Sequence, residues 1–96
     1  MSQTTSTAST RSIVITGAAA GIGRAVAERF AKAGWFIGAY DVDEAGVMAL
    51  RQQLGASRCH AGRLDVSNTD DWARELEAFV KAAGGRLDVL VNNAGV

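Results

Sequence analysis

The sequence predicts an α/β protein with a doubly wound parallel sheet and the element order β-α-β-α-β-α-β. Short apolar, β-branched runs alternate with segments of helical periodicity, and glycine follows each helical segment. Helical crossovers between strands imply parallel pairing and right-handed connections, so the expected strand order is 3-2-1-4. Because this order reverses beside the first strand, a ligand crevice is expected outside the carboxyl ends of the strands.

The first half of the chain contains two strand–helix units. Ile13, Val14 and Ile15 form a β-branched run suited to a strand buried on both faces. A helix ending at Gly34 is expected next, because apolar residues recur at helical spacing, namely Ile22, Val26, Phe30 and Ala33. The second strand is predicted over residues 35–40 and is closed by Asp41. A helix over residues 44–54 follows it.

The second half contains a third unit and a final strand. Residues 59–64 are a weaker strand candidate, which ends at Asp65-Val66. Ser67 is expected to be the N-cap of the third helix, and Asp70 and Asp71 complement the positive end of its dipole. The buried stripe of that helix is expected to be Trp72, Leu76, Phe79, Val80 and Ala83. Residues 87–91 predict the fourth strand, followed by Asn92-Asn93-Ala94-Gly95.

Composition narrows the classes of function. Ten basic and ten acidic residues cancel, so neither nucleic acid nor a membrane surface is an expected partner. The single cysteine, Cys59, is expected to be a small buried apolar residue, and no metal-ligand cluster surrounds it. One cysteine cannot form an internal disulfide, so a reducing compartment fits and a cytoplasmic location is expected. Residues 1–11 are rich in Ser and Thr and lack the apolar core of a signal peptide, so they predict a disordered tail.

The glycine-rich turn after the first strand is the main candidate ligand site. Its pattern, Gly17-x-x-x-Gly21-x-Gly23, differs from both Gly-x-Gly-x-x-Gly and the P-loop. Gly17 is expected to start the turn, Gly21 to admit a dinucleotide pyrophosphate, and Gly23 to allow close packing of helix on sheet. Ala20 and Ile22 lie between these glycines and are included among the expected cofactor-binding residues. A purely structural turn is the alternative.

Asp41 is a candidate for recognition of the adenosine ribose. It lies at the end of the second strand, eighteen positions after Gly23, a spacing that suits a carboxylate accepting bonds from ribose hydroxyls. The same carboxylate repels a 2′-phosphate, so NAD is expected rather than NADP. A solvated loop aspartate or a helix cap is the alternative. Arg24 is the nearest basic residue to the turn; it is expected on a solvated helix face and leaves some tolerance for NADP.

Three motifs together resemble the short-chain dehydrogenase/reductase family. They are Thr16-Gly17-x-x-x-Gly21-Ile22-Gly23, Asp65-Val66 and Asn92-Asn93-Ala94-Gly95, in the family's order and spacing. The resemblance implies a Rossmann fold, here incomplete, and a nicotinamide dinucleotide cofactor. It covers nearly the whole chain after the tail.

The resemblance also implies roles for single residues. Asp65 is implied to bind the adenine amino group with the Val66 backbone beside it, and Asn92 to hold the central strands together. Ala94 and Gly95 are implied to border the cofactor. From the residues alone, Asp65 is equally a helix-start aspartate, and Asn92-Asn93 is equally a plain turn.

The expected function follows from what the chain contains. The family's catalytic serine, tyrosine and lysine lie downstream of the Asn-Asn-Ala-Gly motif, and no residue here can take their roles. Residues 12–96 are therefore expected to be the N-terminal, cofactor-binding part of a longer NAD(P)-dependent oxidoreductase. That parent is expected to be a homo-oligomer that transfers hydride between a secondary alcohol or ketone and nicotinamide. The alternative is a non-catalytic dinucleotide-binding or interaction module, if the chain naturally ends at Val96.

The predicted topology also bears on stability. Two helices would cover one face of the sheet and a single helix the other, and residues 87–91 would form an apolar edge with unpaired backbone groups. The 96-residue chain alone is therefore expected to be inactive and marginally stable or prone to aggregation.

Overall fold

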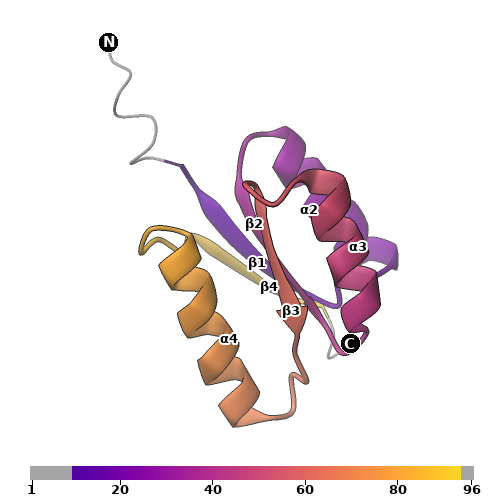
Figure 1. The fold of residues 1–96 in the computed structure, drawn as a ribbon, viewed down its shortest axis with the longest axis vertical. Helices are drawn as coiled ribbons and strands as arrows, with labels where there is room; N and C mark the ends of the chain where they lie inside the picture. Colours follow the sequence, from indigo (N-terminus) through magenta and orange to yellow (C-terminus); the bar gives the residue numbers. More distant parts are fainter. Residues whose placement is uncertain (1–9, 94–96) are drawn as a thin grey trace.

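The four strands form one parallel sheet in the predicted order. The computed structural model describes residues 10–93, so residues 1–9 and 94–96, with the predicted site residues Ala94 and Gly95, lie outside the described part. The strands are β1 (Ser12–Thr16), β2 (Phe36–Asp41), β3 (Cys59–Arg63) and β4 (Val89–Asn92). Their order across the sheet is β3-β2-β1-β4, with every neighbouring pair parallel (Figure 1). The doubly wound topology is confirmed, and the reversal lies between β1 and β4.

Helices cover both faces of the sheet. The helices α2 (Gly21–Lys32) and α3 (Glu44–Leu54) lie on one face, and α4 (Thr69–Ala82) lies on the other (Figure 1). Alternate residues of β1 enter the two cores: Ile13 and Ile15 pack with α2 and α3, and Val14 packs with Phe79 of α4. The expectation of a strand buried on both faces is therefore confirmed. Within residues 10–93, no helix is long and apolar enough to cross a membrane.

The sheet ends in an apolar edge, as the sequence predicts. Leu87, Val89 and Leu90 are all exposed, and Leu90 reaches 47%. The strand β4 begins two residues later than predicted. Just before it, Arg86 and Asp88 form an ion pair, and Asp88 is hydrogen-bonded to the backbone of Ser12. The marginal stability of the isolated chain stays a prediction, which this exposed edge supports.

The start of α4 corrects one assignment. Asn68, rather than Ser67, is the N-cap, since its side-chain oxygen accepts the Asp71 N–H at 3.1 Å. Ser67 instead donates both its backbone N–H and its hydroxyl to the Asp65 carboxylate. Both residue types are good caps, and the tight turn at Asp65 engages Ser67 one position before the helix begins.

Replacing Asn68 with alanine in the intact protein is expected to lower the free energy of unfolding by about 1 kcal/mol, the usual cost of a lost N-cap. Ser67→Ala is the matched control and is expected to cost less, because the Ser67 hydroxyl binds Asp65 and does not cap α4. Thermal or urea unfolding of the two variants measures the difference. A larger loss for Ser67→Ala contradicts the assignment of the cap to Asn68.

Candidate functional site

The glycine turn between β1 and α2 has the backbone that its sequence requires. Gly17 and Gly21 adopt left-handed conformations, with φ of 66° and 62°. A side chain at Gly23 would collide with the carbonyl of Gly17, so Gly23 allows the start of α2 to lie against the turn. A Cβ at Gly21 would meet no atom within 4 Å. The turn is therefore closed on the Gly23 side and open on the Gly21 side.

The N-terminal end of α2 is available to bind an anion. Its N-cap is Ala20, whose side chain cannot cap the helix, and the first turn contains no acidic residue. The N–H groups at this end therefore have no carboxylate or hydroxyl within the helix to accept them. Ile22 stands beside them with 74% of its surface exposed. An external anion is the natural partner of such a helix end.

The glycine turn is also tied to the end of β2. The Ala18 N–H donates to the carbonyl oxygen of Tyr40 at 3.1 Å, and the Ala19 N–H donates to Oδ2 of Asp41 at 3.1 Å. Asp41 thus fixes the turn in addition to any role toward a ligand. The sequence alone did not indicate this contact, which depends on β1 and β2 lying side by side.

The Asp41 carboxylate can accept further hydrogen bonds. Its Oδ1 accepts the Asp43 N–H at 3.0 Å and its Oδ2 accepts one N–H, which leaves lone pairs on both oxygens. Asp41 does not cap α3; that is done by Asp43, which accepts the Gly46 N–H at 3.0 Å. Asp41 is half-buried at the strand end, so a hydroxyl donor can reach it from solvent.

The end of β4 is joined to β1 and to the glycine turn. Thr16 donates its hydroxyl to Asn92 Oδ1 at 2.9 Å and accepts the Asn93 N–H at 2.9 Å. The Asn93 amide donates to the Gly17 carbonyl at 3.4 Å. Asn92 therefore links the two central strands, in the position that the family resemblance implies. Thr16 makes contacts to both asparagines, and its signal in the sequence is its place as the first residue of the glycine motif, directly after the strand.

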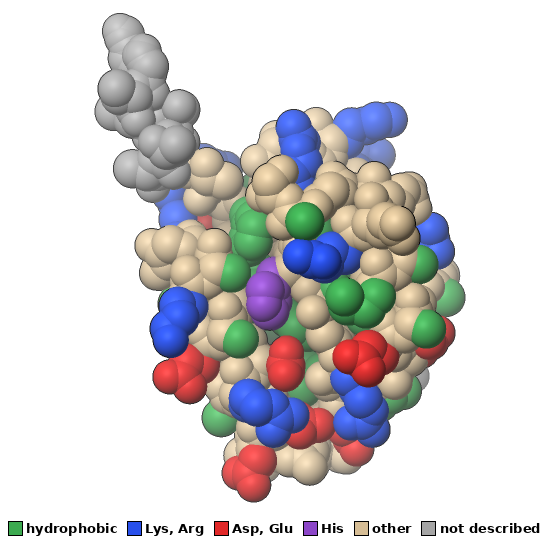
Figure 2. Space-filling view, in the orientation of Figure 1, with side chains coloured by type: hydrophobic (Ala, Val, Ile, Leu, Met, Phe, Trp, Pro, Cys, Tyr) green, Lys and Arg blue, Asp and Glu red, His purple; other side chains and the backbone are tan. Residues whose placement is uncertain are grey.

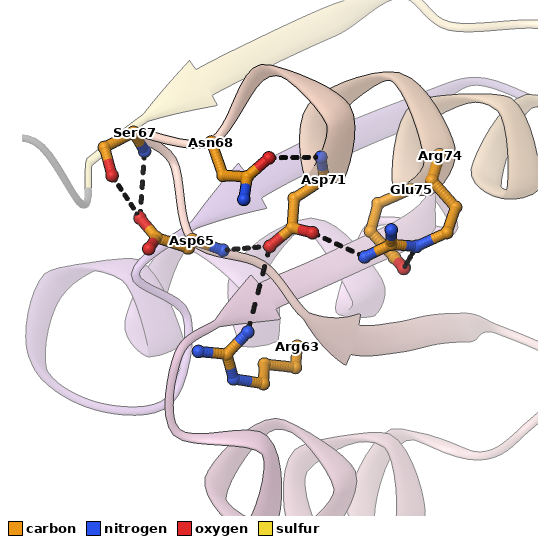
Figure 3. Close-up of polar contacts among 7 residues, drawn as sticks. All are labelled: Arg63, Asp65, Ser67, Asn68, Asp71, Arg74 and Glu75. Carbon is orange, nitrogen blue, oxygen red and sulfur yellow. Dashed lines mark hydrogen bonds and ion pairs between the residues drawn. The ribbon is translucent and has the colours of Figure 1, made fainter.

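Asp65 follows β3 in a segment stabilised by polar contacts (Figure 3). Its Oδ1 accepts the Ser67 hydroxyl at 2.6 Å and the Ser67 N–H at 3.0 Å, and these bonds lower the pKa of Asp65. Its backbone N–H donates to Asp71 Oδ2 at 3.3 Å. Within the described part of the chain, Asp65 Oδ2 accepts no hydrogen bond, so this ionised carboxylate can still accept an external donor.

These strand ends surround one hollow of about 350 Å³. It is lined by Gly17, Asp41, Val42, Leu64, Asp65 and Val66, which come from the ends of three neighbouring strands. Four of the predicted site residues therefore meet in one place. A larger hollow of about 560 Å³, between the C-terminal halves of α2 and α3, contains none of them.

Several carboxylates gather around the strand ends, with the Arg63 side chain among them. On the face shown in Figure 2, the Asp and Glu side chains lie mostly in the lower half, toward the starts of α3 and α4. Asp41, Asp43 and Glu44 follow β2 in close succession, and Asp65 follows β3. The uncapped start of α2 offers backbone N–H groups to an anion beside these carboxylates. The site therefore favours one bound anionic group at α2 and opposes further negative charge near Asp41.

Two other conspicuous side chains have structural roles. Arg24 contacts Glu28 Oε2 at 3.4 Å and Gln53 Oε1 at 2.7 Å, so it links α2 to α3 on the outer face, as expected of a solvated helix residue. Cys59 is buried, and burial raises the pKa of its thiol to about 11. A neutral thiol at this position is a poor nucleophile, in agreement with its predicted packing role.

Comparison with known proteins agrees with this fold. The family model described as short chain dehydrogenase matches residues 11–96. The chain is 46% identical to an uncharacterized short-chain type dehydrogenase/reductase of Sinorhizobium fredii, over 90% of this chain and 15% of that protein. It is 39% identical to 3beta-hydroxysteroid dehydrogenase 2 of Eggerthella lenta, over 86% of this chain and 32% of that protein.

A solved structure of a related reductase has a similar fold. The crystal structure of 3-ketoacyl-(acyl-carrier-protein) reductase from Brucella melitensis, complexed with NADH, superposes with a TM-score of 0.79 at 32% identity. The match covers 83% of this chain and 32% of that one. The chain thus spans a third or less of the length of these proteins. With its strand order, glycine turn and matching motifs, the chain belongs to the short-chain dehydrogenase family.

Proposed function

We propose that this chain binds NAD at the carboxyl ends of β1, β2 and β3, as the cofactor-binding part of a longer oxidoreductase. The observation that carries the proposal is the single hollow that Gly17, Asp41, Asp65 and Val66 line together. Two nearby features suit a dinucleotide: the uncapped start of α2, and carboxylates with free lone pairs. When bound, the nicotinamide ring supplies the hydride chemistry, and the protein binds and orients it.

The phosphates are assigned to the glycine turn and the start of α2. Gly21 leaves open space on its outer side, so a pyrophosphate can approach the backbone there without meeting a side chain. Ala20 and Ile22 border this space, and the N–H groups of the first turn of α2 donate into it. Gly17 and Gly23 keep the turn in this shape.

The adenosine half is assigned to the ends of β2 and β3. Asp41 accepts the ribose hydroxyls, and Asp65 and Val66 recognise the adenine base. NAD is preferred to NADP because a 2′-phosphate would approach the Asp41 carboxylate, while Arg24 is held by Glu28 and Gln53. Asn92 acts through strand pairing, and Ala94 and Gly95 are assigned from the motif alone.

The reaction proposed for the longer protein is hydride transfer between a secondary alcohol or ketone and nicotinamide. The similar proteins include a 3beta-hydroxysteroid dehydrogenase and a 3-ketoacyl-(acyl-carrier-protein) reductase, whose names describe hydroxyl–ketone interconversion. The family resemblance further supports a homo-oligomer, and the balanced charge and single cysteine support a cytoplasmic location.

Titration of the intact protein with NAD, NADP and ADP-ribose tests the proposal. We expect NAD to bind about tenfold or more tightly than NADP, in line with repulsion of a 2′-phosphate by one carboxylate. ADP-ribose is expected to compete with NAD, because the residues proposed here are assigned to the adenosine diphosphate half. A protein that binds none of the three nucleotides contradicts the proposal. Binding without reduction of NAD by any secondary alcohol favours the non-catalytic module.

A further inference from the structure

We infer that Asp71 and Trp72, in the first turn of α4, are positioning residues that hold the Asp65–Val66 segment in the form that reads adenine. This inference rests on the proposed function and concerns the recognition of adenine by Asp65 and Val66. Neither residue lines the hollow, and the sequence pattern predicted only a helix-dipole role for Asp71 and a packing role for Trp72. Both contact the backbone of that segment through polar side-chain atoms.

The two contacts lie at opposite ends of the segment. The Asp71 Oδ2 accepts the Asp65 N–H at 3.3 Å, and the indole Nε1–H of Trp72 donates to the Val66 carbonyl at 2.7 Å. Consecutive residues of one helix turn therefore fix the first N–H and the last C=O of a two-residue segment. The α4 end of these contacts is visible in Figure 3, where Asp71 lies between Asp65 and Arg74.

Asp71 is itself held rigidly, as a positioning group must be. Only 8% of its surface is exposed, although it is a carboxylate. Its Oδ1 accepts Arg74 at 2.6 Å, Arg63 lies 3.8 Å from its Oδ2, and its own N–H is bound by Asn68. The bond to Arg74 lowers the pKa of Asp71, which keeps it a hydrogen-bond acceptor at neutral pH.

The segment held in this way offers one acceptor and one donor on adjacent residues. Within residues 10–93, neither the Asp65 Oδ2 nor the Val66 N–H has a hydrogen-bond partner, and both residues line the hollow. Adenine presents an amino donor beside a ring-nitrogen acceptor, which matches this pair. Hypoxanthine reverses the pattern, with a carbonyl acceptor beside a ring N–H. Discrimination between these bases therefore depends on the orientation that α4 imposes.

The test compares NAD with nicotinamide hypoxanthine dinucleotide, in which a keto oxygen replaces the adenine amino group. Calorimetric titration of the intact protein is expected to show tighter binding of NAD. Asp71→Ala and Trp72→Phe are each expected to lower this preference about fivefold, the size of one lost hydrogen bond. Asp71→Asn is expected to retain most of the preference, because its amide oxygen still accepts the Asp65 N–H.

Two matched controls isolate the positioning role. Asp70→Asn changes the neighbouring exposed carboxylate in the same helix turn, and Trp35→Phe changes a tryptophan that packs edge-on against Phe30. Both are expected to keep the wild-type preference. If Asp71→Ala does not fold, Trp72→Phe and its control still provide the test.

The outcomes separate the two proposals. Equal weakening of both dinucleotides in Asp71→Ala and Trp72→Phe, with the preference unchanged, overturns the positioning role and leaves the proposed function intact. A wild-type protein that binds NAD without preferring adenine overturns it as well. A wild-type protein that binds neither dinucleotide overturns the proposed function itself.

Discussion

Asp41→Ala in the intact protein is expected to reduce the preference for NAD over NADP by about tenfold or more, because repulsion of the 2′-phosphate is removed. The affinity for NAD is also expected to fall, for two reasons. The ribose loses an acceptor, and the Ala19 N–H loses the carboxylate that fixes the glycine turn. Binding constants for both dinucleotides, measured by calorimetry or fluorescence, give the ratio.

Asp43→Ala is the matched control for this change. It removes the same charge two residues away, but Asp43 caps α3 and does not contact the turn. We expect it to cost some stability and to leave the dinucleotide preference nearly unchanged. An equal drop in preference for both variants would mean that the acidic surface as a whole, rather than Asp41, selects NAD. An unchanged preference in Asp41→Ala would refute the assignment.

Gly23→Ala is expected to have the largest effect on stability of any change in the glycine turn. The added methyl group would overlap the Gly17 carbonyl, which is backbone and cannot move without displacing α2 from the sheet. We expect a loss of roughly 1–3 kcal/mol in the free energy of unfolding, the usual range for overpacking a closed site. NAD binding is expected to be lost as well, because the turn and the start of α2 move together.

Gly21→Ala is the comparison that separates stability from binding. Its Cβ meets no atom within 4 Å, so the cost in stability is that of the left-handed backbone, about 1–2 kcal/mol. The methyl group would stand in the space proposed for the pyrophosphate, so NAD affinity is expected to fall much more than stability. Urea unfolding and NAD titration of both variants check this. Normal NAD binding by Gly21→Ala would contradict the assignment of the phosphates to this turn.

The sequence predicted most of the fold because its signals are local. The β-branched run at residues 13–15, helical spacing and the glycines after helices each report on one segment, and a handedness rule then limits the topology. The candidate site was predictable for the same reason, since the carboxyl ends of parallel strands share one edge of the sheet. Gly17, Asp41 and Asp65 therefore meet in the structure although they are far apart in the chain.

The misassigned N-cap of α4 shows what local sequence signals cannot predict. Ser67 and Asn68 are adjacent and equally suited to an N-cap, and the choice depends on which of them the Asp65 carboxylate engages. Thr16 was not singled out for a related reason. Its two partners, Asn92 and Asn93, become neighbours only when β4 pairs with β1.

The sequence by itself thus determined the family, the strand order and the residues at the strand ends, because these depend on local pattern and motif spacing. The tertiary structure alone decided how those residues are held. Asp41 fixes the glycine turn, Thr16 joins β4 to it, and Asp71 with Trp72 restrains the Asp65–Val66 segment. The physical reason is that a hydrogen bond is short and directional, so its partners are known only once packing has placed both atoms.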